Sequence, residues 1–265
     1  PKEENAEPIK FRTKLLIGAD GANSIVRRAI FGPNKNPPYV FAYHEIVESP
    51  ENADLNDFHP SRCDVIYDGR VSPDFYGWVF PHGKQTSIGC GSAHKRFSLK
   101  EATSLLRKNA NLDAAKTIRK EGAPIPLKPM RRWDDGSNVV LTGDAAGVVA
   151  PSSGEGIYYA MHTGRLCADA VIDALATGNA KALRAPRKRF MKEHGKVFFV
   201  LGMLQWIWYG SDKRREQFVK MCADADVQRL TWESYLNKKL VKRDPMAHLR
   251  VFAKDVQQLL GLSAR

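Results

Sequence analysis

The stretch NVVLTGDAAGVVAPSSGEGIYYAM, residues 138–161, begins as an apolar run, passes through a glycine-rich turn and ends in a helical pattern. The apolar run is typical of a buried strand that delivers one carboxylate, Asp144, at its tip, where it can accept hydrogen bonds from a polyol. A helix expected from about residue 157 begins with unpaired backbone N–H groups and the positive end of its dipole. Because such a helix start stabilises an anion, the stretch predicts a ligand site.

A second motif near the start of the chain has a similar form. A short apolar strand, residues 14–19, runs into GADGANSIVR, residues 18–27. Small residues at such a turn allow the backbone to bend sharply and to approach a ligand closely. Many structural strand-to-helix turns share this spacing, so the motif gains weight only in combination with the first stretch.

Composition limits the class of protein. The chain has 265 residues, 43% of them hydrophobic, which is enough for one large domain or two small ones with a core. Its formal net charge of +12 favours an anionic partner, and nucleic acid, anionic lipid and a pyrophosphate-bearing ligand all satisfy that condition. The four cysteines form no closely spaced pair, so we expect reduced thiols and no metal site.

The middle of the chain is expected to form an antiparallel sheet. Residues 39–97 alternate apolar and polar side chains, and residues 81–84 are expected to form the turn between two strands. A helix with a capping box at Ser98 is expected over residues 98–119. Residues 187–262 are expected to be almost wholly helical.

The most apolar segment of the chain is VFFVLGMLQWIWY, residues 197–209. It is too short to cross a bilayer, which needs ~20 such residues. Lys192 and Lys196 precede it and the cations of residues 213–215 follow it, a pattern typical of a helix at a membrane interface. A core helix with solvated charged ends fits the same pattern equally well.

Taken together, GADGANSIVR and GDAAGVVAPSSGEGIYYAM resemble the two C-terminal FAD fingerprints of the para-hydroxybenzoate hydroxylase-like flavoproteins. The resemblance implies a mixed α/β (α+β) fold, namely the C-terminal portion of that FAD-binding fold with an antiparallel substrate sheet and a helical C-terminal tail. The implied divisions are the remainder of the FAD/NAD(P)-binding domain (residues 1–38), a substrate domain (39–130), the return of the FAD-binding domain (131–180) and a helical region (181–265).

The same resemblance implies which residues hold the cofactor. Asp20 and Gly21 would lie near the FAD pyrophosphate and the path of the nicotinamide nucleotide. Asp144 would bind the FAD ribitol, and the backbone of residues 153–156 would support the isoalloxazine. A helix start there favours the reduced flavin, which is negatively charged at its pyrimidine end. The expected cofactor-binding residues are Asp20, Gly21, Gly143, Asp144, Ala145, Gly147, Ser153, Gly154 and Gly156.

Three aromatic side chains share one face of an expected strand. Strand periodicity places Tyr76, Trp78 and Phe80 together, either as ordinary core aromatics or as a wall for an apolar chain or the flavin ring. Their segment, YGWVFPHG, is similar to the YxWxFPxxG-type motif of geranylgeranyl reductases, with one fewer residue before the glycine. The implied substrate-binding residues are Tyr76, Trp78, Phe80 and Pro81.

The resemblance extends over nearly the whole chain, to the geranylgeranyl reductases of chlorophyll and bacteriochlorophyll synthesis. The implied activity is the stepwise, NADPH- and FAD-dependent reduction of C=C bonds of a geranylgeranyl chain to a phytyl chain. That chain would be carried on (bacterio)chlorophyll or as the diphosphate. The expected location is the cytoplasmic or stromal face of a photosynthetic membrane, at its periphery, and nucleic acid is not an expected partner.

One feature departs from the family pattern. Those enzymes begin with a strand and a GxGxxG turn that hold the adenosine diphosphate of FAD, and this chain shows no such motif. We therefore expect a fragment, or a chain completed by another polypeptide that supplies the N-terminal dinucleotide-binding segment. Alone, such a chain would hold FAD weakly.

Two other functions stay open at this level. An FAD-dependent aromatic monooxygenase of the same fold would pass electrons to O2, and an inactive prenyl- or pigment-binding fragment would need no flavin. No residue stands out as a proton donor, because His82 is most simply a solvated loop residue and His162 is expected to be structural.

Overall fold

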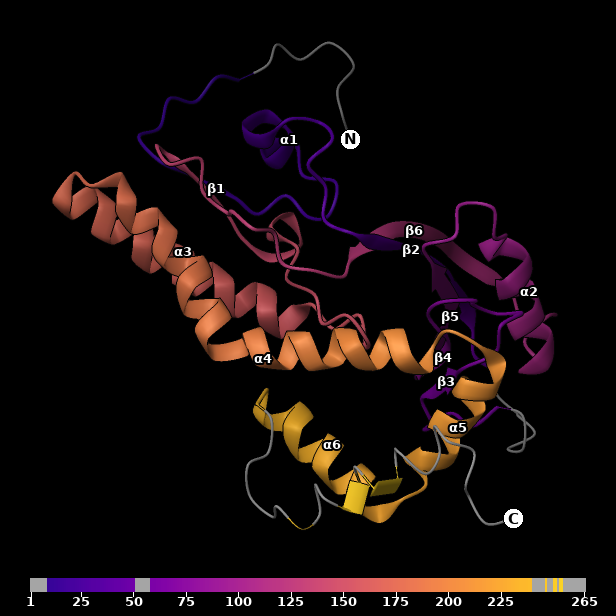
Figure 1. The fold of residues 1–265 in the computed structure, drawn as a ribbon. Coiled ribbons are helices and arrows are strands. Elements are labelled where there is room, and N and C mark those ends of the chain that lie inside the picture. Colours follow the sequence, from indigo (N-terminus) through magenta and orange to yellow (C-terminus); the bar gives the residue numbers. More distant parts are fainter. Residues whose placement is uncertain (1–8, 51–57, 240–245, 247–249, 252, 255–265) are drawn as a thin grey trace.

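The computed structural model describes residues 9–50 and 58–239, together with residues 246, 250, 251, 253 and 254. These residues form two sheets flanked by helices (Figure 1). The strands are β1 (Leu16–Gly18), β2 (Tyr39–Glu48), β3 (Asp64–Ile66), β4 (Gly77–His82), β5 (Gln85–Ser92), β6 (Thr117–Pro126) and β7 (Val139–Leu141). The helices are α1 (Ile25–Phe31), α2 (Leu99–Asn109), α3 (Ile157–Thr177), α4 (Ala185–Trp208), α5 (Asp212–Cys222) and α6 (Ala225–Asn237), with 3-10 turns η1 (Gly143–Ala146) and η2 (Ala180–Arg184).

The smaller sheet pairs β1 with β7 in parallel, although β2 to β6 lie between these two strands in the sequence. All three residues of β7 are buried, which is why this strand reads as a continuous apolar run and not as an alternation. In a parallel pair both strands end at the same edge. The turns that follow β1 and β7 therefore lie side by side.

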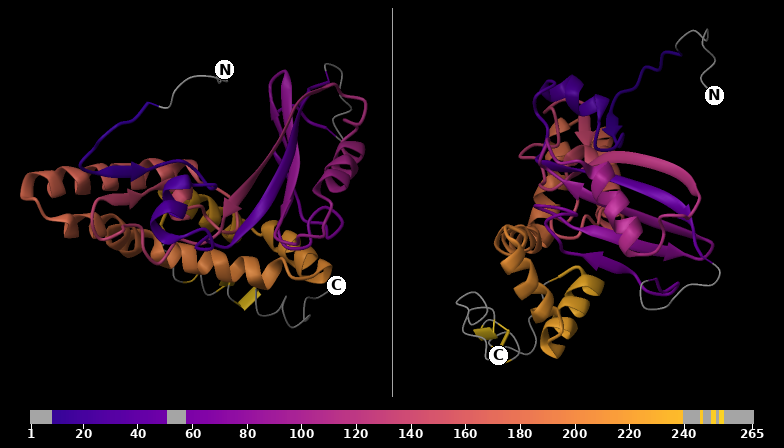
Figure 2. Two further views of the ribbon diagram at one scale, coloured as in Figure 1. Left: turned by 90° about the horizontal axis from the view of Figure 1, so that it is seen from above. Right: turned by 90° about the vertical axis from the view of Figure 1, so that its right-hand side faces the viewer.

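The larger sheet is antiparallel, with strand order β3-β4-β5-β2-β6. Helix α2 covers one of its faces, and Leu106 of the helix packs there with Val79 and Ile88 of the strands. Because side chains alternate along a strand, Trp78 and Phe80 face the opposite side. In Figure 2 (left) this sheet stands at one end of the molecule with α2 on its outer face.

Helices α3 and α4 run beside each other away from the sheet, as two views show (Figures 1 and 2). Their shared core includes Tyr159, Phe190 and Phe198, together with Trp133 from the segment before β7. The end of α4 belongs to a second core, in which Trp208 packs in one cluster with Tyr76 of the sheet segment. The long helices thus connect the small parallel pair to the antiparallel sheet.

Most of the expected elements are confirmed, including the turn between β4 and β5 and the helix from residue 157. The expected helix over residues 98–119 is wrong in its second half. It ends at Asn109, and Asn111 takes a positive φ of 51° that turns the chain back. Residues 117–126 then form β6, an edge strand, where prolines are tolerated because the outer N–H positions have no strand partner. The predicted helical tail is confirmed as far as Asn237 and then falls largely outside the described residues.

The apolar segment 197–209 forms the second half of α4 and the residue after it. Trp208 is 1% exposed and belongs to the core, whereas Trp206 is 77% exposed. The core expectation is therefore confirmed for the Trp208 side of the helix, and the Trp206 side is exposed. Among the described residues, none of the helices has the length and apolar character needed to cross a bilayer.

Candidate functional site

The two glycine-rich motifs meet at the ends of β1 and β7. Gly18 pairs with Leu141, and the Thr142 N–H donates to the Gly18 carbonyl at 3.0 Å. The turn after β1 therefore lies against the turn after β7. Sequence reasoning expected both motifs to serve one ligand, and the fold brings them together.

Asp20 caps the start of α1. Its Oδ2 accepts the backbone N–H of Ile25 at 2.6 Å and that of Val26 at 3.1 Å. Desolvation acts to raise the pKa of this carboxyl, but hydrogen bonds from the Ser24 side chain and from the helix backbone outweigh it and lower the pKa. The carboxylate therefore fixes the turn, while Gly21 beside it has open space above its Cα.

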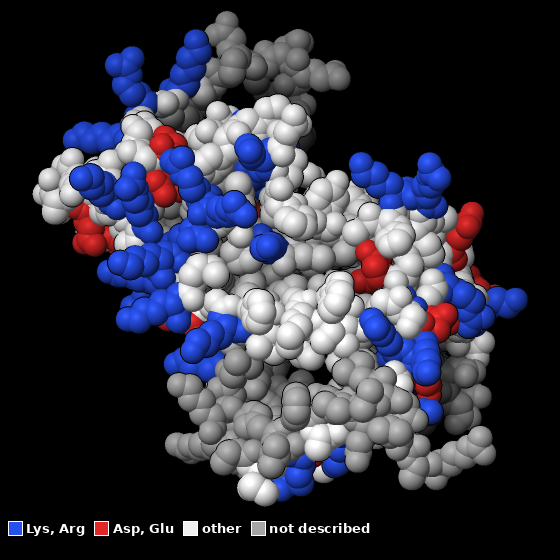
Figure 3. All heavy atoms as spheres, viewed as in Figure 1, with Lys and Arg blue, Asp and Glu red and all other residues white. Residues whose placement is uncertain are grey.

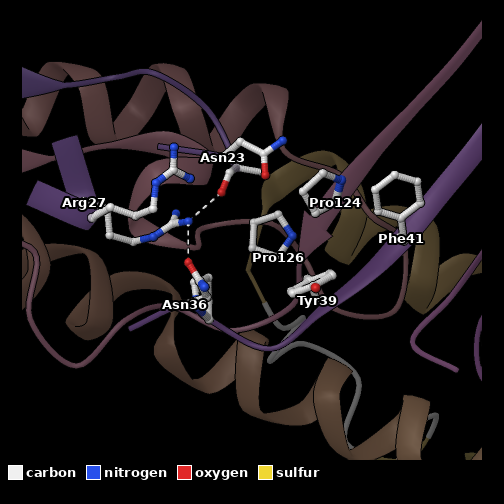
Figure 4. Close-up of a pocket in the computed structure, with 10 residues that line it drawn as sticks. Asn23, Arg27, Asn36, Tyr39, Phe41, Pro124 and Pro126 are labelled. Atoms are coloured by element: carbon white, nitrogen blue, oxygen red, sulfur yellow. Dashed lines mark hydrogen bonds between the residues drawn. The ribbon is translucent and has the colours of Figure 1, made fainter. Parts of the chain in front are cut away.

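Arg27 ties the two motifs together, a role to which sequence reasoning assigned no residue. The side chain is 2% exposed, and its guanidinium donates to the carbonyls of Ala145 at 3.3 Å and Ala22 at 2.7 Å. It also donates to Asn36 Oδ1 at 2.9 Å (Figure 4). The only signal in the sequence is the cation at the end of the GADGANSIVR motif, and its partner lies 118 positions away.

Asp144 lies at the tip of β7, within the 3-10 turn η1. Burial raises the pKa of its carboxyl, and in the described part of the chain no side chain or backbone N–H donates to it. A Cβ placed on Gly156 would lie 3.4 Å from Asp144 Oδ1, so the carboxylate lies against the N-cap residue of α3. No side chain caps that helix start. A half-buried acceptor thus faces a helix end with unused donors.

The loop between η1 and α3 is shaped by two glycines in the left-handed region. Gly147 has φ 80°, and a Cβ there would collide with the Lys128 carbonyl. Gly154 has φ 66°, and its N–H donates to the Ala150 carbonyl at 2.9 Å. The Gly154 N–H is therefore committed within the loop. The unused donors are those at the start of α3. Gly143 and the buried Ala145 lie in the preceding turn.

Two tyrosine hydroxyls hold this loop from the other side. Tyr76 donates to the Ser153 carbonyl at 2.6 Å, and Tyr209 donates to the Ser152 carbonyl at 3.0 Å. Tyr76 comes from the antiparallel sheet and Tyr209 from the end of α4. Burial raises the pKa of Tyr76, so this hydroxyl keeps its proton and acts as a donor. The expected substrate face and the expected cofactor loop are therefore directly joined.

The aromatic residues of β4 share one face, as strand periodicity predicts. The Tyr76 and Trp78 rings lie 6.1 Å apart and the Trp78 and Phe80 rings 6.4 Å apart, while Tyr76 also stacks on Phe75 at 4.2 Å. Trp78, Phe80 and the following Pro81 are half-buried. This face is therefore buried at Tyr76 and more accessible at Phe80 and Pro81, toward the end of the strand.

A pocket of about 140 Å³ lies next to the GADGANSIVR motif (Figure 4). It is bounded by Asn23, Arg27 and Arg28 on one side and by Tyr39 and other residues of β2 and β6 on the other. None of the expected site residues lines it. The pocket lies on the side of the Asp20 turn where Arg27 and Arg28 are located, and Asp144 and the loop of residues 153–156 do not line it.

Comparison with known sequences gives consistent results. A family model described as lycopene cyclase protein matches residues 85–257. A geranylgeranyl diphosphate reductase of Rhodobacter capsulatus is 56% identical over 97% of this chain and 64% of that protein. A geranylgeranyl diphosphate reductase of Synechocystis sp. is 36% identical over 94% of this chain and 62% of that protein. The chain thus spans less than two-thirds of the length of these relatives.

Solved structures share the fold. A geranylgeranyl bacteriochlorophyll reductase-like protein from Thermoplasma acidophilum has a TM-score of 0.67 at 21% identity, covering 94% of this chain and 61% of that one. The flavin-dependent brominase Bmp2 has a TM-score of 0.58 at 16% identity, covering 82% and 56%. These likenesses confirm the expected fold class. Because the family model covers more than half of the chain, the chain belongs to the lycopene cyclase protein family, and its expected resemblance to geranylgeranyl reductases is confirmed.

Proposed function

We propose that this chain is part of an FAD-dependent geranylgeranyl reductase and supplies both the ribitol side of the flavin site and the substrate face. The similar proteins named geranylgeranyl diphosphate reductases support the substrate class. One observation carries the proposal most directly. The half-buried Asp144 carboxylate accepts no hydrogen bond within the described residues and lies against the uncapped start of α3.

The residues present fit FAD. A half-buried carboxylate without a donor is costly, and a ribitol hydroxyl donating to Asp144 would remove that cost. The free N–H groups and the dipole at the start of α3 would stabilise negative charge on the flavin's pyrimidine end. Gly154 lets the cofactor loop lie close to the sheet, since a Cβ there would meet the Phe75 ring at 3.5 Å and the Tyr76 hydroxyl at 3.6 Å. When bound, FAD would take up a hydride from NADPH and supply it to carbon.

The GADGANSIVR motif, residues 18–27, would lie beside the FAD pyrophosphate and the path of the nicotinamide nucleotide. Asp20 cannot itself attract an anion, and its carboxylate is occupied in capping α1. Its role is to hold the turn so that Gly21 and Ala22 offer backbone at an open surface. The buried Arg27 guanidinium, behind this turn, adds positive charge suited to a pyrophosphate.

The substrate face suits an unactivated alkene. Such a bond has no oxygen to polarise, so binding must come from apolar contact in a place that excludes water. Trp78 and Phe80 offer that contact, and Tyr76 fixes the sheet to the Ser153 carbonyl of the cofactor loop. The raised pKa of Tyr76 makes it a positioning residue and a poor proton donor.

The surface of α4 supports a peripheral location at the cytoplasmic or stromal face of the membrane. Phe199, Met203 and Trp206 are 73%, 42% and 77% exposed and lie on one side of the helix. Lys and Arg side chains gather over the end of the molecule where α3 and α4 meet (Figure 3). Apolar area combined with cations is the arrangement that binds an anionic lipid surface.

The test is turnover by the encoded protein that contains this chain, supplied with FAD and NADPH. Geranylgeranyl diphosphate and geranylgeranylated bacteriochlorophyll should each be tried, and mass spectrometry should show a gain of two hydrogens for each reduced bond. Oxygen consumption matched by an oxygenated product would replace the proposal with a monooxygenase. Failure to bind flavin, together with retention of the prenyl substrate, would replace it with a binding protein.

A further inference from the structure

Three potential metal ligands converge between α3 and α4, at the second turn of α3 after the cofactor loop. His162 comes from α3, and Glu193 and His194 come from α4. One ligand atom from each lies within 4.8 Å of the other two. His162 Nε2 is 3.0 Å from Glu193 Oε2, which is in turn 3.8 Å from His194 Nε2.

His194 supplies an independent indication that something binds here. Its side chain is 2% exposed, and its Nδ1 lies 3.2 Å from the Lys238 carbonyl, to which it can only donate. That bond fixes the tautomer, so Nε2 carries a lone pair. Nε2 is buried, has no hydrogen-bond partner among the described residues and points into the cluster.

We propose that His162, Glu193 and His194 form a binding site for a divalent transition metal, with Zn²⁺ as the best match, that fastens α3 to α4. Zinc takes imidazole nitrogen and carboxylate oxygen at about 2.0–2.2 Å, which puts neighbouring ligands about 3.3 Å apart in a tetrahedron. The two contact distances lie on either side of that value. Glu193 is 45% exposed, so a water can take the fourth position.

The surroundings favour this assignment over a simple hydrogen-bonded pair. A bond between His162 and Glu193 alone would leave His194 Nε2 buried and unsatisfied. The nearby Lys238 ammonium is turned away, since it lies 2.6 Å from Glu155 and 3.7 Å from the centre of the Tyr235 ring. The Tyr159 ring closes one side of His194 at 5.4 Å. The site does not depend on flavin or on the proposed reaction.

The experiment uses the encoded protein, free of any affinity tag and stripped with a chelator. Calorimetric titration with Zn²⁺ and elemental analysis after dialysis should give one tightly bound ion per chain, and Zn²⁺ should raise the melting temperature. His162→Ala and Glu193→Gln should each weaken binding by at least the roughly tenfold typical of changes around a metal. Both should melt like the unchanged protein when EDTA is present. His82→Ala, at the exposed end of β4, is the matched control and should bind normally.

Cobalt identifies the ligands. Bound Co²⁺ should show the visible bands of a four-coordinate nitrogen and oxygen site, and these bands should be absent in His162→Ala. Thiolate charge-transfer bands would place the ion on the exposed Cys63 or Cys222 and overturn the proposal. It would equally be overturned by a wild-type protein that binds no zinc, or by variants at positions 162 and 193 that bind it as well as the control.

Discussion

At the scale of single residues, the buried Arg27 guanidinium links the turn after β1 to the turn after β7, which neither sequence motif indicates by itself. Arg27 hydrogen-bonds to carbonyls in both turns, and burial lowers its pKa. Arg27→Met should therefore leave those acceptors unsatisfied and lower the free energy of unfolding by about 1–3 kcal/mol. Arg28→Met, at the exposed neighbouring position, should change it by less than about 0.5 kcal/mol. Urea denaturation of both variants measures the difference, and equal effects would remove the linking role from Arg27.

Asp144 offers the most direct residue-level test of the flavin site. In the encoded protein, Asp144→Ala should weaken FAD binding by about 1–3 kcal/mol, because ribitol donors lose their acceptor. Fluorescence titration with FAD measures this. Asp169→Asn, an exposed acidic residue of α3, serves as the control. Unchanged affinity in Asp144→Ala would mean that the carboxylate does not contact the cofactor. Gly154→Val is a less clean probe, since a φ of 66° strains valine with or without a ligand.

These two residues also show how far the sequence leads. Asp144 could be predicted because it follows a buried strand and precedes a glycine-rich helix start, all within one stretch. Arg27 could not, because its meaning depends on Ala145, which no local pattern connects to it. His162 and His194 are missed for the same reason. Each is unremarkable on its own helix, and only the packing of α3 on α4 brings them together.

At the scale of elements, an ion pair fastens α2 to the large sheet. Glu45 of β2 is 8% exposed and lies 2.6 Å from Arg107 of α2. Desolvation acts to raise the pKa of Glu45, but hydrogen bonds from Tyr43, Arg107 and Lys120 outweigh it, and the net pKa is below the usual 4.5.

A pH dependence follows from that lowered pKa. The folded protein holds this proton less readily than the unfolded chain, so the pair's contribution is fully present above about pH 4.5 and is lost as the pH falls through the folded pKa. Urea denaturation at pH values between 6 and 3 should show that the free energy of unfolding falls as the pH is lowered. Glu45→Gln should be less stable at pH 6 and should show a shallower fall. An identical slope would assign the acid sensitivity to other carboxyls.

Helix α4 presents two tryptophans with opposite environments, which the sequence alone could not separate because they lie two positions apart in one apolar run. Trp206→Ser should reduce sedimentation with anionic liposomes in a salt-sensitive way and change the free energy of unfolding by less than about 0.5 kcal/mol. Trp208→Ser should instead destabilise the fold by about 3–5 kcal/mol. If Trp206→Ser sediments like the unchanged protein, the exposed side of α4 is not the membrane contact.

The missed half of the 98–119 helix has a similar cause. Residues 110–116 contain no strong helix breaker, and the strand that follows is defined by its pairing with β2 rather than by its own pattern. Burial alternates poorly along β6, where five consecutive residues from Arg119 are exposed. An edge strand of this kind forms because it hydrogen-bonds to a neighbouring strand, here β2. Such strands are therefore the elements that a single sequence identifies least well.

At the scale of the whole molecule, the tyrosine hydroxyl that joins the sheet to the cofactor loop is the contact to change. Tyr76→Phe removes only the donor to the Ser153 carbonyl and should lower the free energy of unfolding by about 0.5–1.5 kcal/mol. Turnover should fall while FAD content is kept, because the substrate face would no longer be fixed relative to the loop. Tyr43→Phe, which removes a comparable bond to Glu45, should leave turnover unchanged. A loss of FAD in Tyr76→Phe would assign the residue to cofactor binding.

The parallel pairing of β1 with β7 also sets the order in which the molecule can fold. The hairpin of β4 and β5 closes within a few residues, whereas Arg27 must find a carbonyl 118 positions further on. Contacts between such distant segments form late, since closing a long loop costs entropy before any contact repays it. During synthesis, β1 waits without its partner until β7 has left the ribosome. If the site holds flavin as proposed, flavin uptake in a cell would report that β1 and β7 have paired.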